Sequence, residues 1–90
     1  MNTDYIVEVN SIGGYCLNVL FNTGEIIRLD LSRFIHESND PTINSYRQLD
    51  RFNSFRVTRD GIVWGDFDFV VAKEIILNKK EIKPRILFQL

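Results

Sequence analysis

The segment FRVTRDGIVW at residues 55–64 constrains the fold of this chain more than any other stretch. Phe55 and Val57 alternate with polar residues, and the apolar run Ile62-Val63-Trp64 follows the dipeptide Asp60-Gly61. Alternation of this kind is typical of a β-strand, and Asp-Gly commonly supplies the positive backbone φ angles of a tight turn. The segment therefore predicts an antiparallel β-hairpin.

Three more strands are predicted in the first third of the chain. Gly13-Gly14 offers one turn, and the sequence NTG at residues 22–24 offers a second between two apolar runs. Short strands joined by such turns form an antiparallel meander, which we expect over residues 5–9, 15–21 and 25–31. The alternate residues that share a face within each strand are Tyr5, Val7 and Val9, then Tyr15, Leu17, Val19 and Phe21, then Ile27, Leu29 and Leu31.

The middle of the chain is predicted to be helical. Ser32 is in position to cap a short helical turn, and Asp40 or Asn39 caps a second helix that has Pro41 at its first position. The apolar residues of this second helix recur every three positions, which drifts around a helix of 3.6 residues per turn, so we expect only about two to three turns. These residues are Ile43, Tyr46 and Leu49, with Phe52 at or beyond the end.

The segment after the hairpin admits two interpretations. Either the strand continues past Asp68, or the chain turns there into a helix. We favour a helix from about Phe69 to Asn78, because Asn78 and the two lysines that follow it suit a helix C-terminus. Residues 81–90 are expected to add an edge strand, where Pro84 is tolerated.

The whole chain is predicted to be one α+β domain. Its 90 residues, 44% of them hydrophobic, suffice for one core but not for two. The expected architecture is a small antiparallel sheet, made of the three-stranded meander plus a hairpin, with one or two short helices and a C-terminal helix or strand extension. Residues 1–69 form the main body, and residues 70–90 form the extension.

The charge and the apolar patterning favour a cytoplasmic protein. The 11 basic and 12 acidic side chains are interleaved, so no overall field draws the chain to nucleic acid or to anionic lipid. No apolar run approaches the roughly 18 residues that span a bilayer, and the N-terminus carries acids where a signal peptide is basic. The single cysteine, Cys16, agrees with a reducing compartment.

Few residues point to catalysis or to metal binding. Cys16 and His36 are the only cysteine and the only histidine of the chain. A zinc site needs three or four protein ligands, and a catalytic Cys–His pair needs a third, orienting group. Asp60, Asp66 and Asp68 supply fewer oxygens than a calcium loop requires. No phosphate-binding loop is recognisable. We therefore expect no catalytic residue, no metal and no cofactor.

The stretch DGIVWGDFDF at residues 60–69 contains candidate binding residues. It holds the only tryptophan of the chain, a residue type enriched at the centre of protein interfaces. The simpler interpretation places this tryptophan in the core and uses Asp66 or Asp68 to cap a helix. The candidate partner-binding residues are Trp64, Asp66, Phe67 and Asp68.

A second candidate surface is basic. Arginines are interleaved with aromatic residues between positions 46 and 59, a mixture that binds single-stranded nucleic acid. Asp50 and Asp60 lie among them, which favours instead a solvated face of mixed charge. The arginines of this surface are Arg47, Arg51, Arg56 and Arg59.

Two motifs carry a resemblance to a known family. FNTGEIIRLDLSRF at 21–34 resembles a pattern F-x-(D/N)-G followed by D-x-S, with Thr23 inserted, and GIVWGDFDF at 61–69 resembles I-x-W followed by G-x-D, without the usual spacer. Over about residues 5–69 the chain is similar to the bacterial family called domain of unknown function 2442. The resemblance implies a small α+β domain whose members are often encoded in toxin–antitoxin-like pairs.

These observations favour a non-enzymatic protein-interaction module. The leading hypothesis is an antitoxin-like or inhibitory regulator that masks a partner, such as a cognate toxin or, in a phage or mobile element, a bacterial defence component. The partner would be held by an exposed strand edge or by the C-terminal segment. The alternative is a nucleic-acid-binding regulator that uses the four arginines. Assembly with further copies of the chain stays open.

Overall fold

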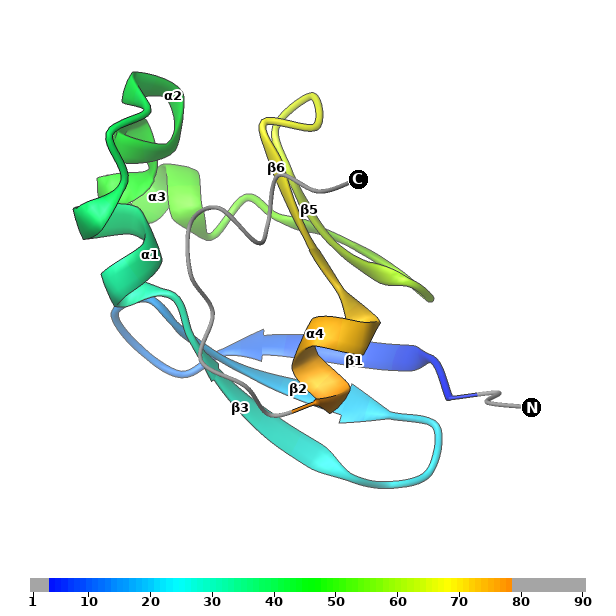
Figure 1. Cartoon of the computed structure of the whole chain (residues 1–90). Coiled ribbons are helices and arrows are strands. Elements are labelled where there is room, and N and C mark those ends of the chain that lie inside the picture. Colours follow the sequence, from blue (N-terminus) through cyan, green and yellow to red (C-terminus); the bar gives the residue numbers. More distant parts are fainter. Residues whose placement is uncertain (1–3, 79–90) are drawn as a thin grey trace.

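The computed structural model describes residues 4–78, which form two small antiparallel sheets and five short helical segments. The strand order is β1-β2-β3 in the first sheet and β4-β5-β6 in the second. Helices α1 to α3 lie together at one end of the molecule (Figure 1). The predicted α+β class is confirmed. The elements are β1 (Ile6–Ser11), β2 (Cys16–Phe21), β3 (Ile26–Asp30), α1 (Ser32–Glu37), α2 (Pro41–Asn44), η1 (Ser45–Arg47), α3 (Leu49–Phe52), β4 (Arg56–Thr58), β5 (Gly61–Trp64), β6 (Phe69–Ala72) and α4 (Lys73–Leu77).

The first sheet confirms the predicted meander, with one irregularity in β1. A β-bulge between Ile6 and Glu8 shifts the register of β1 against β2. Because a bulge inserts one extra residue, it breaks the alternation of faces. Ile6 is therefore buried and Val7 is 54% exposed, so Tyr5, Val7 and Val9 do not share a face as predicted. The buried residues of this sheet are Ile6, Leu17, Val19, Phe21 and Leu29, with Val9, Tyr15 and Ile27 packed against them.

The short helix after β3 forms as predicted, but Ser32 does not cap it. Leu31 is the N-cap residue of α1, and no side chain caps the helix. Ser32 instead donates from its backbone N and its Oγ to Oδ1 of Asp30, at 2.9 and 2.6 Å. These hydrogen bonds stabilise the charged carboxylate and hold the pKa of Asp30 below its usual value.

The second predicted helix starts as expected and then breaks into three short pieces. Asp40 accepts a hydrogen bond from the backbone N of Thr42 at 2.8 Å, so it caps α2 as predicted. The chain then tightens into the 3-10 helix η1, which has three residues per turn and so keeps Ile43 and Tyr46 on one buried face. Gln48 is extended and interrupts the helix, which leaves Leu49 45% exposed.

The hairpin of β4 and β5 is confirmed, but the role predicted for Gly61 is wrong. Thr58 pairs with Gly61, so Arg59 and Asp60 occupy the turn, and Gly61 is absent from the residues with positive φ. A Cβ atom on Gly61 would lie 2.7 Å from the backbone oxygen of Val71 in β6. Glycine is needed here because the neighbouring strand approaches closely.

The helix predicted from about Phe69 is wrong in its first half, because Phe69–Ala72 form strand β6. β6 pairs with β5 from Trp64 opposite Phe69 to Gly61 opposite Ala72. Pairing with β6 satisfies the backbone hydrogen-bonding groups along the second edge of β5, and β6 buries every other residue. A helix at this place would leave that edge of β5 unpaired. Only Lys73–Leu77 are helical, with Asn78 as the C-cap. The strand predicted over 81–90 lies outside the described residues.

An aromatic cluster joins the second sheet to the helices. The rings of Trp64 and Phe69 stack with centroids 4.5 Å apart, and Phe52 of α3 also stacks on Trp64 with centroids 5.6 Å apart. The indole Nε1 of Trp64 donates to the backbone oxygen of Phe52 at 2.7 Å. Buried indole groups require such a partner. The cluster therefore fixes the ends of β5 and β6 against the helical segment.

Candidate functional site

The loop of residues 65–68, between β5 and β6, is the candidate site. Trp64 pairs with Phe69 at its base, and the backbone N of Asp68 donates to the oxygen of Trp64 at 2.9 Å. Gly65 has φ +61°, a conformation that glycine adopts readily. A Cβ atom on Gly65 would also collide with the carboxylate of Asp68 and the hydroxyl of Tyr46. The loop is therefore folded tightly back on its own base.

Phe67 projects from this loop. Its side chain is 63% exposed, more than any other large hydrophobic residue within 4–78. Its φ of +61° is the only positive value at a non-glycine residue in the same range. The left-handed conformation costs an L-residue about 1–2 kcal/mol, so the surrounding contacts must hold it. An exposed aromatic ring on a strained backbone is an unusual combination, which makes this loop the candidate site.

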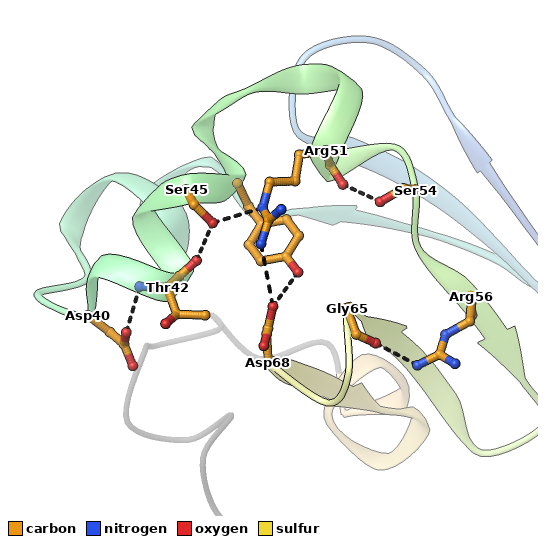
Figure 2. Close-up of polar contacts among 9 residues, drawn as sticks. Asp40, Thr42, Ser45, Arg51, Ser54, Arg56, Gly65 and Asp68 are labelled. Carbon is orange, nitrogen blue, oxygen red and sulfur yellow. Dashed lines mark hydrogen bonds and ion pairs between the residues drawn. The ribbon is translucent and has the colours of Figure 1, made fainter.

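On one side, the helical segment holds the loop through the carboxylate of Asp68. The hydroxyl of Tyr46 donates to Oδ2 of Asp68 at 2.6 Å. The guanidinium of Arg51 points to the same carboxylate (Figure 2) and lies 3.8 Å from the same oxygen. Arg51 also donates from Nε to Oγ of Ser45 at 2.9 Å and lies over the ring of Tyr46. Burial and the bond to Asp68 raise the pKa of Tyr46 to about 12, so its phenol keeps its proton at neutral pH.

On the other side, Arg56 of β4 holds the loop. Its Nη2 donates to the backbone oxygen of Gly65 at 2.6 Å (Figure 2). The same guanidinium lies 5.8 Å from the centre of the Phe67 ring, within the range of a cation–π contact. Arg56 therefore supports both the backbone of the loop and the side chain that the loop displays.

The four residues predicted as partner-binding differ in their burial and contacts. Trp64 is fully buried in the aromatic cluster, so its partner-facing interpretation is wrong and the core interpretation holds. Asp66 and Phe67 are exposed at the tip of the loop. Asp68 is half-buried and bonds to Tyr46, so neither it nor Asp66 caps the helix α4, whose N-cap is Ala72.

The four arginines do not gather at one place. Arg51 and Arg56 flank the 65–68 loop (Figure 2). Arg47 donates to the backbone oxygen of His36, and Arg59 lies over the ring of Tyr5 at the turn of the β4–β5 hairpin. That turn is at the opposite end of the hairpin from the loop, since Thr58 pairs with Gly61 there while Arg56 pairs with Val63. The nucleic-acid interpretation stays a prediction.

The other candidate ligands are separately engaged. Nδ1 of His36 lies 2.8 Å from the backbone oxygen of Ser32, and Sγ of Cys16 lies 3.9 Å from Nη2 of Arg28. Asp60 pairs with Lys73 at 3.5 Å. Across residues 4–78, no group of three or more His, Cys, Asp and Glu side chains is placed to hold a metal ion. No helix in this range is long and apolar enough to cross a membrane.

Sequence reasoning found the loop but missed the residues that hold it. Tyr46 and Asp68 lie 22 positions apart in the chain, and Arg51 was assigned to a different surface. A tyrosine on the apolar face of a helix reads as a core residue, and nothing in its spacing indicates a bond to a distant aspartate. These residues meet because the helical segment packs on the second sheet, where Tyr46 contacts both Asp68 and the ring of Phe69.

Comparison with known proteins identifies a family. The model of the family described as Protein of unknown function (DUF2442) matches residues 6–81. The match extends past residue 69, where the resemblance read from the motifs ended, and it covers β6 and α4. Searches of curated proteins and of solved structures found no match. The chain belongs to the DUF2442 family.

Proposed function

We propose that this protein is a non-enzymatic interaction module that covers the surface of a partner protein, as an antitoxin-like or inhibitory regulator. The observation that carries the proposal is the display of Phe67 at the tip of the 65–68 loop. Large aromatic residues supply much of the binding energy of protein interfaces.

The loop is preorganised for binding. Ordering a flexible segment on association costs about 0.5–1.5 kcal/mol per immobilised side chain. Here the bonds of Asp68 to the helical segment and of Arg56 to Gly65 fix the loop before a partner arrives. A loop held in this way presents Phe67 with little further entropic cost, which is a property of surfaces that bind other proteins.

One observation also supports the nucleic-acid alternative. Arg51 and Arg56 lie beside the exposed ring of Phe67, and single strands bind to aromatic rings flanked by cations. Asp66 of the same loop opposes it, since this exposed carboxylate would repel phosphates. A protein partner accommodates this charge, so it is the preferred proposal.

Affinity capture from a native lysate of the source organism tests the proposal. The full chain is immobilised as wild type, as Phe67→Ala and as Ile26→Ala, with and without nuclease. Ile26 is the matched control, because it is 61% exposed on β3 in the other sheet. We expect the wild-type chain to capture one protein in stoichiometric amount, with or without nuclease. The Phe67→Ala chain should fail to capture this protein, and the Ile26→Ala chain should capture it as wild type does.

Two results would contradict the proposal. Retention of nucleic acid alone, with an affinity that falls steeply as salt rises, would favour the nucleic-acid alternative. Equal capture by Phe67→Ala and by wild type would show that the loop is not the contact. If a protein is captured through the loop, its identity decides between a toxin and a defence component. Cell fractionation of the chain itself tests the predicted cytoplasmic location.

A further inference from the structure

We infer that the partner of the 65–68 loop is a protein with an apolar pocket bordered by a basic side chain, which receives Phe67 as the anchor and pairs with Asp66. The inference rests on the proposed function and specifies the chemistry of the partner. Asp66 and Phe67 are neighbours in the chain, and both are exposed at the tip. A ring and a carboxylate presented together require a surface that buries one and neutralises the other.

The charges around the loop favour a basic border and not an acidic one. Arg51 is paired with Asp68, and Arg56 donates to the oxygen of Gly65. Asp66 has no hydrogen bond or ion pair within residues 4–78, unlike Asp60 and Asp68. The guanidinium of Arg56 is engaged by the loop backbone and by the ring of Phe67, so the exposed carboxylate of Asp66 is the charged group that a cation on the partner complements.

The cation–π contact limits the shape of the pocket. The guanidinium of Arg56 lies against the Phe67 ring, so the partner does not enclose the ring on all sides. The positive φ at residue 67 and the hydrogen bond from Asp68 to Trp64 keep the ring projecting from the end of the β5–β6 hairpin. A shallow apolar pocket at a protein surface fits this geometry better than a deep enclosed one.

The same geometry disfavours a nucleic acid at the tip. A base could stack on Phe67, but its adjoining phosphate would approach Asp66, which is adjacent in the chain and unpaired within the described range. Like charges at close approach are destabilising. The carboxylate that favours a basic protein surface therefore selects against a polyanion.

Site-specific photo-crosslinking tests the inference. The phenyl ring of residue 67 is replaced with the benzophenone analogue of phenylalanine in the full chain, and the matched control carries the same analogue at position 26. After irradiation in lysate, the crosslinked peptides are sequenced by mass spectrometry. We expect position 67, and not position 26, to crosslink to a protein segment that contains apolar side chains and a lysine or arginine.

Charge variants in the crosslinking chain test the basic border. We expect Asp66→Asn to lower the crosslinking yield and Asp66→Lys to lower it by about tenfold, since reversal converts an attraction into a repulsion. The yield with Asp66 intact should fall as salt rises, and the yield with Asp66→Asn should respond less. Unchanged thermal unfolding of both variants shows that the fold is kept.

The outcomes separate the inference from the proposed function. If wild type captures a protein but position 67 forms no crosslink, the inference fails and the proposed function stands. Crosslinks to nucleic acid, crosslinked segments without a basic residue, or an unchanged yield with Asp66→Lys also overturn the inference. If wild type captures no protein, both fail together.

Discussion

At the scale of single residues, two glycines of the second sheet are required for different reasons. Gly65 needs its positive φ and also the space that a Cβ atom would fill. Gly61 needs only space, because β6 passes 2.7 Å from where a Cβ atom would stand. The sequence Asp60-Gly61 reads as a turn motif, yet the glycine is explained by a strand that the motif does not predict.

Replacing Gly61 with alanine is expected to lower the free energy of unfolding by about 1–3 kcal/mol, because β6 must move away from the added methyl group. Urea unfolding measures the change. Asp60→Ala is the control in the same turn: its side chain is 86% exposed, and its ion pair with Lys73 is expected to contribute about 0–1 kcal/mol. Equal stability of Gly61→Ala and wild type would show that the two strands separate easily.

Trp64 is expected to be indispensable for folding, because its side chain is fully buried. Trp64→Ala removes the ring that stacks on Phe52 and Phe69, and large-to-small changes of this kind cost about 3–5 kcal/mol. Urea unfolding with far-ultraviolet circular dichroism measures the loss. Phe67→Ala is the control, because an exposed side chain contributes about 0.5 kcal/mol or less. A folded Trp64→Ala that merely lost its partner would contradict the core assignment.

At the scale of elements, the sequence correctly predicted the segments whose apolar residues follow a single repeat, either that of a strand or that of a helix. The meander and the β4–β5 hairpin show clear alternation and are confirmed. The run from Phe69 to Leu77 contains apolar residues that fit both a strand and a helix, and local pattern cannot decide between them. The open edge of β5 decides, since pairing there completes the second sheet. The bulge in β1 was equally unpredictable, because it depends on register against β2.

The attachment of the 65–68 loop to the helices is expected to stabilise both. Asp68→Ala leaves the buried hydroxyl of Tyr46 without its acceptor, which costs about 1–3 kcal/mol. Asp66→Ala, two positions away in the same loop, is expected to change stability by about 0.5 kcal/mol or less. Urea unfolding gives both values, and faster hydrogen exchange at the Asp68 amide would report the released loop. Indistinguishable variants would show that the Tyr46 bond contributes nothing.

At the scale of the whole molecule, the candidate site combines residues from four parts of the chain. Asp66, Phe67 and Asp68 were predicted because they follow the only tryptophan of the chain, a residue type enriched at protein interfaces. Tyr46 from η1, Arg51 from α3 and Arg56 from β4 were not assigned to this loop, because their meeting depends on how the helical segment packs on the second sheet. The burial of Trp64 also depends on that packing, so composition alone could not decide it.

The packing of the helical segment on the loop also predicts how stability depends on alkaline pH. Tyr46 has a usual pKa of 10.0, and the fold raises it to about 12, first through burial and then through the bond to Asp68. The folded state therefore holds the phenolic proton more tightly than the unfolded state. The corresponding stability is fully present below pH 10 and is lost as pH rises towards 12.

Urea unfolding at a series of pH values from 8 upward, on wild type and Tyr46→Phe, isolates this contribution, because the lysines titrate in both proteins. We expect wild type to lose its stability advantage between about pH 10 and pH 12. Absorbance of ionised tyrosine should show a component near pH 12 that Tyr46→Phe removes. Parallel stability curves for the two proteins would mean that Tyr46 reaches solvent in the folded state and that the loop is not anchored to the helices through it.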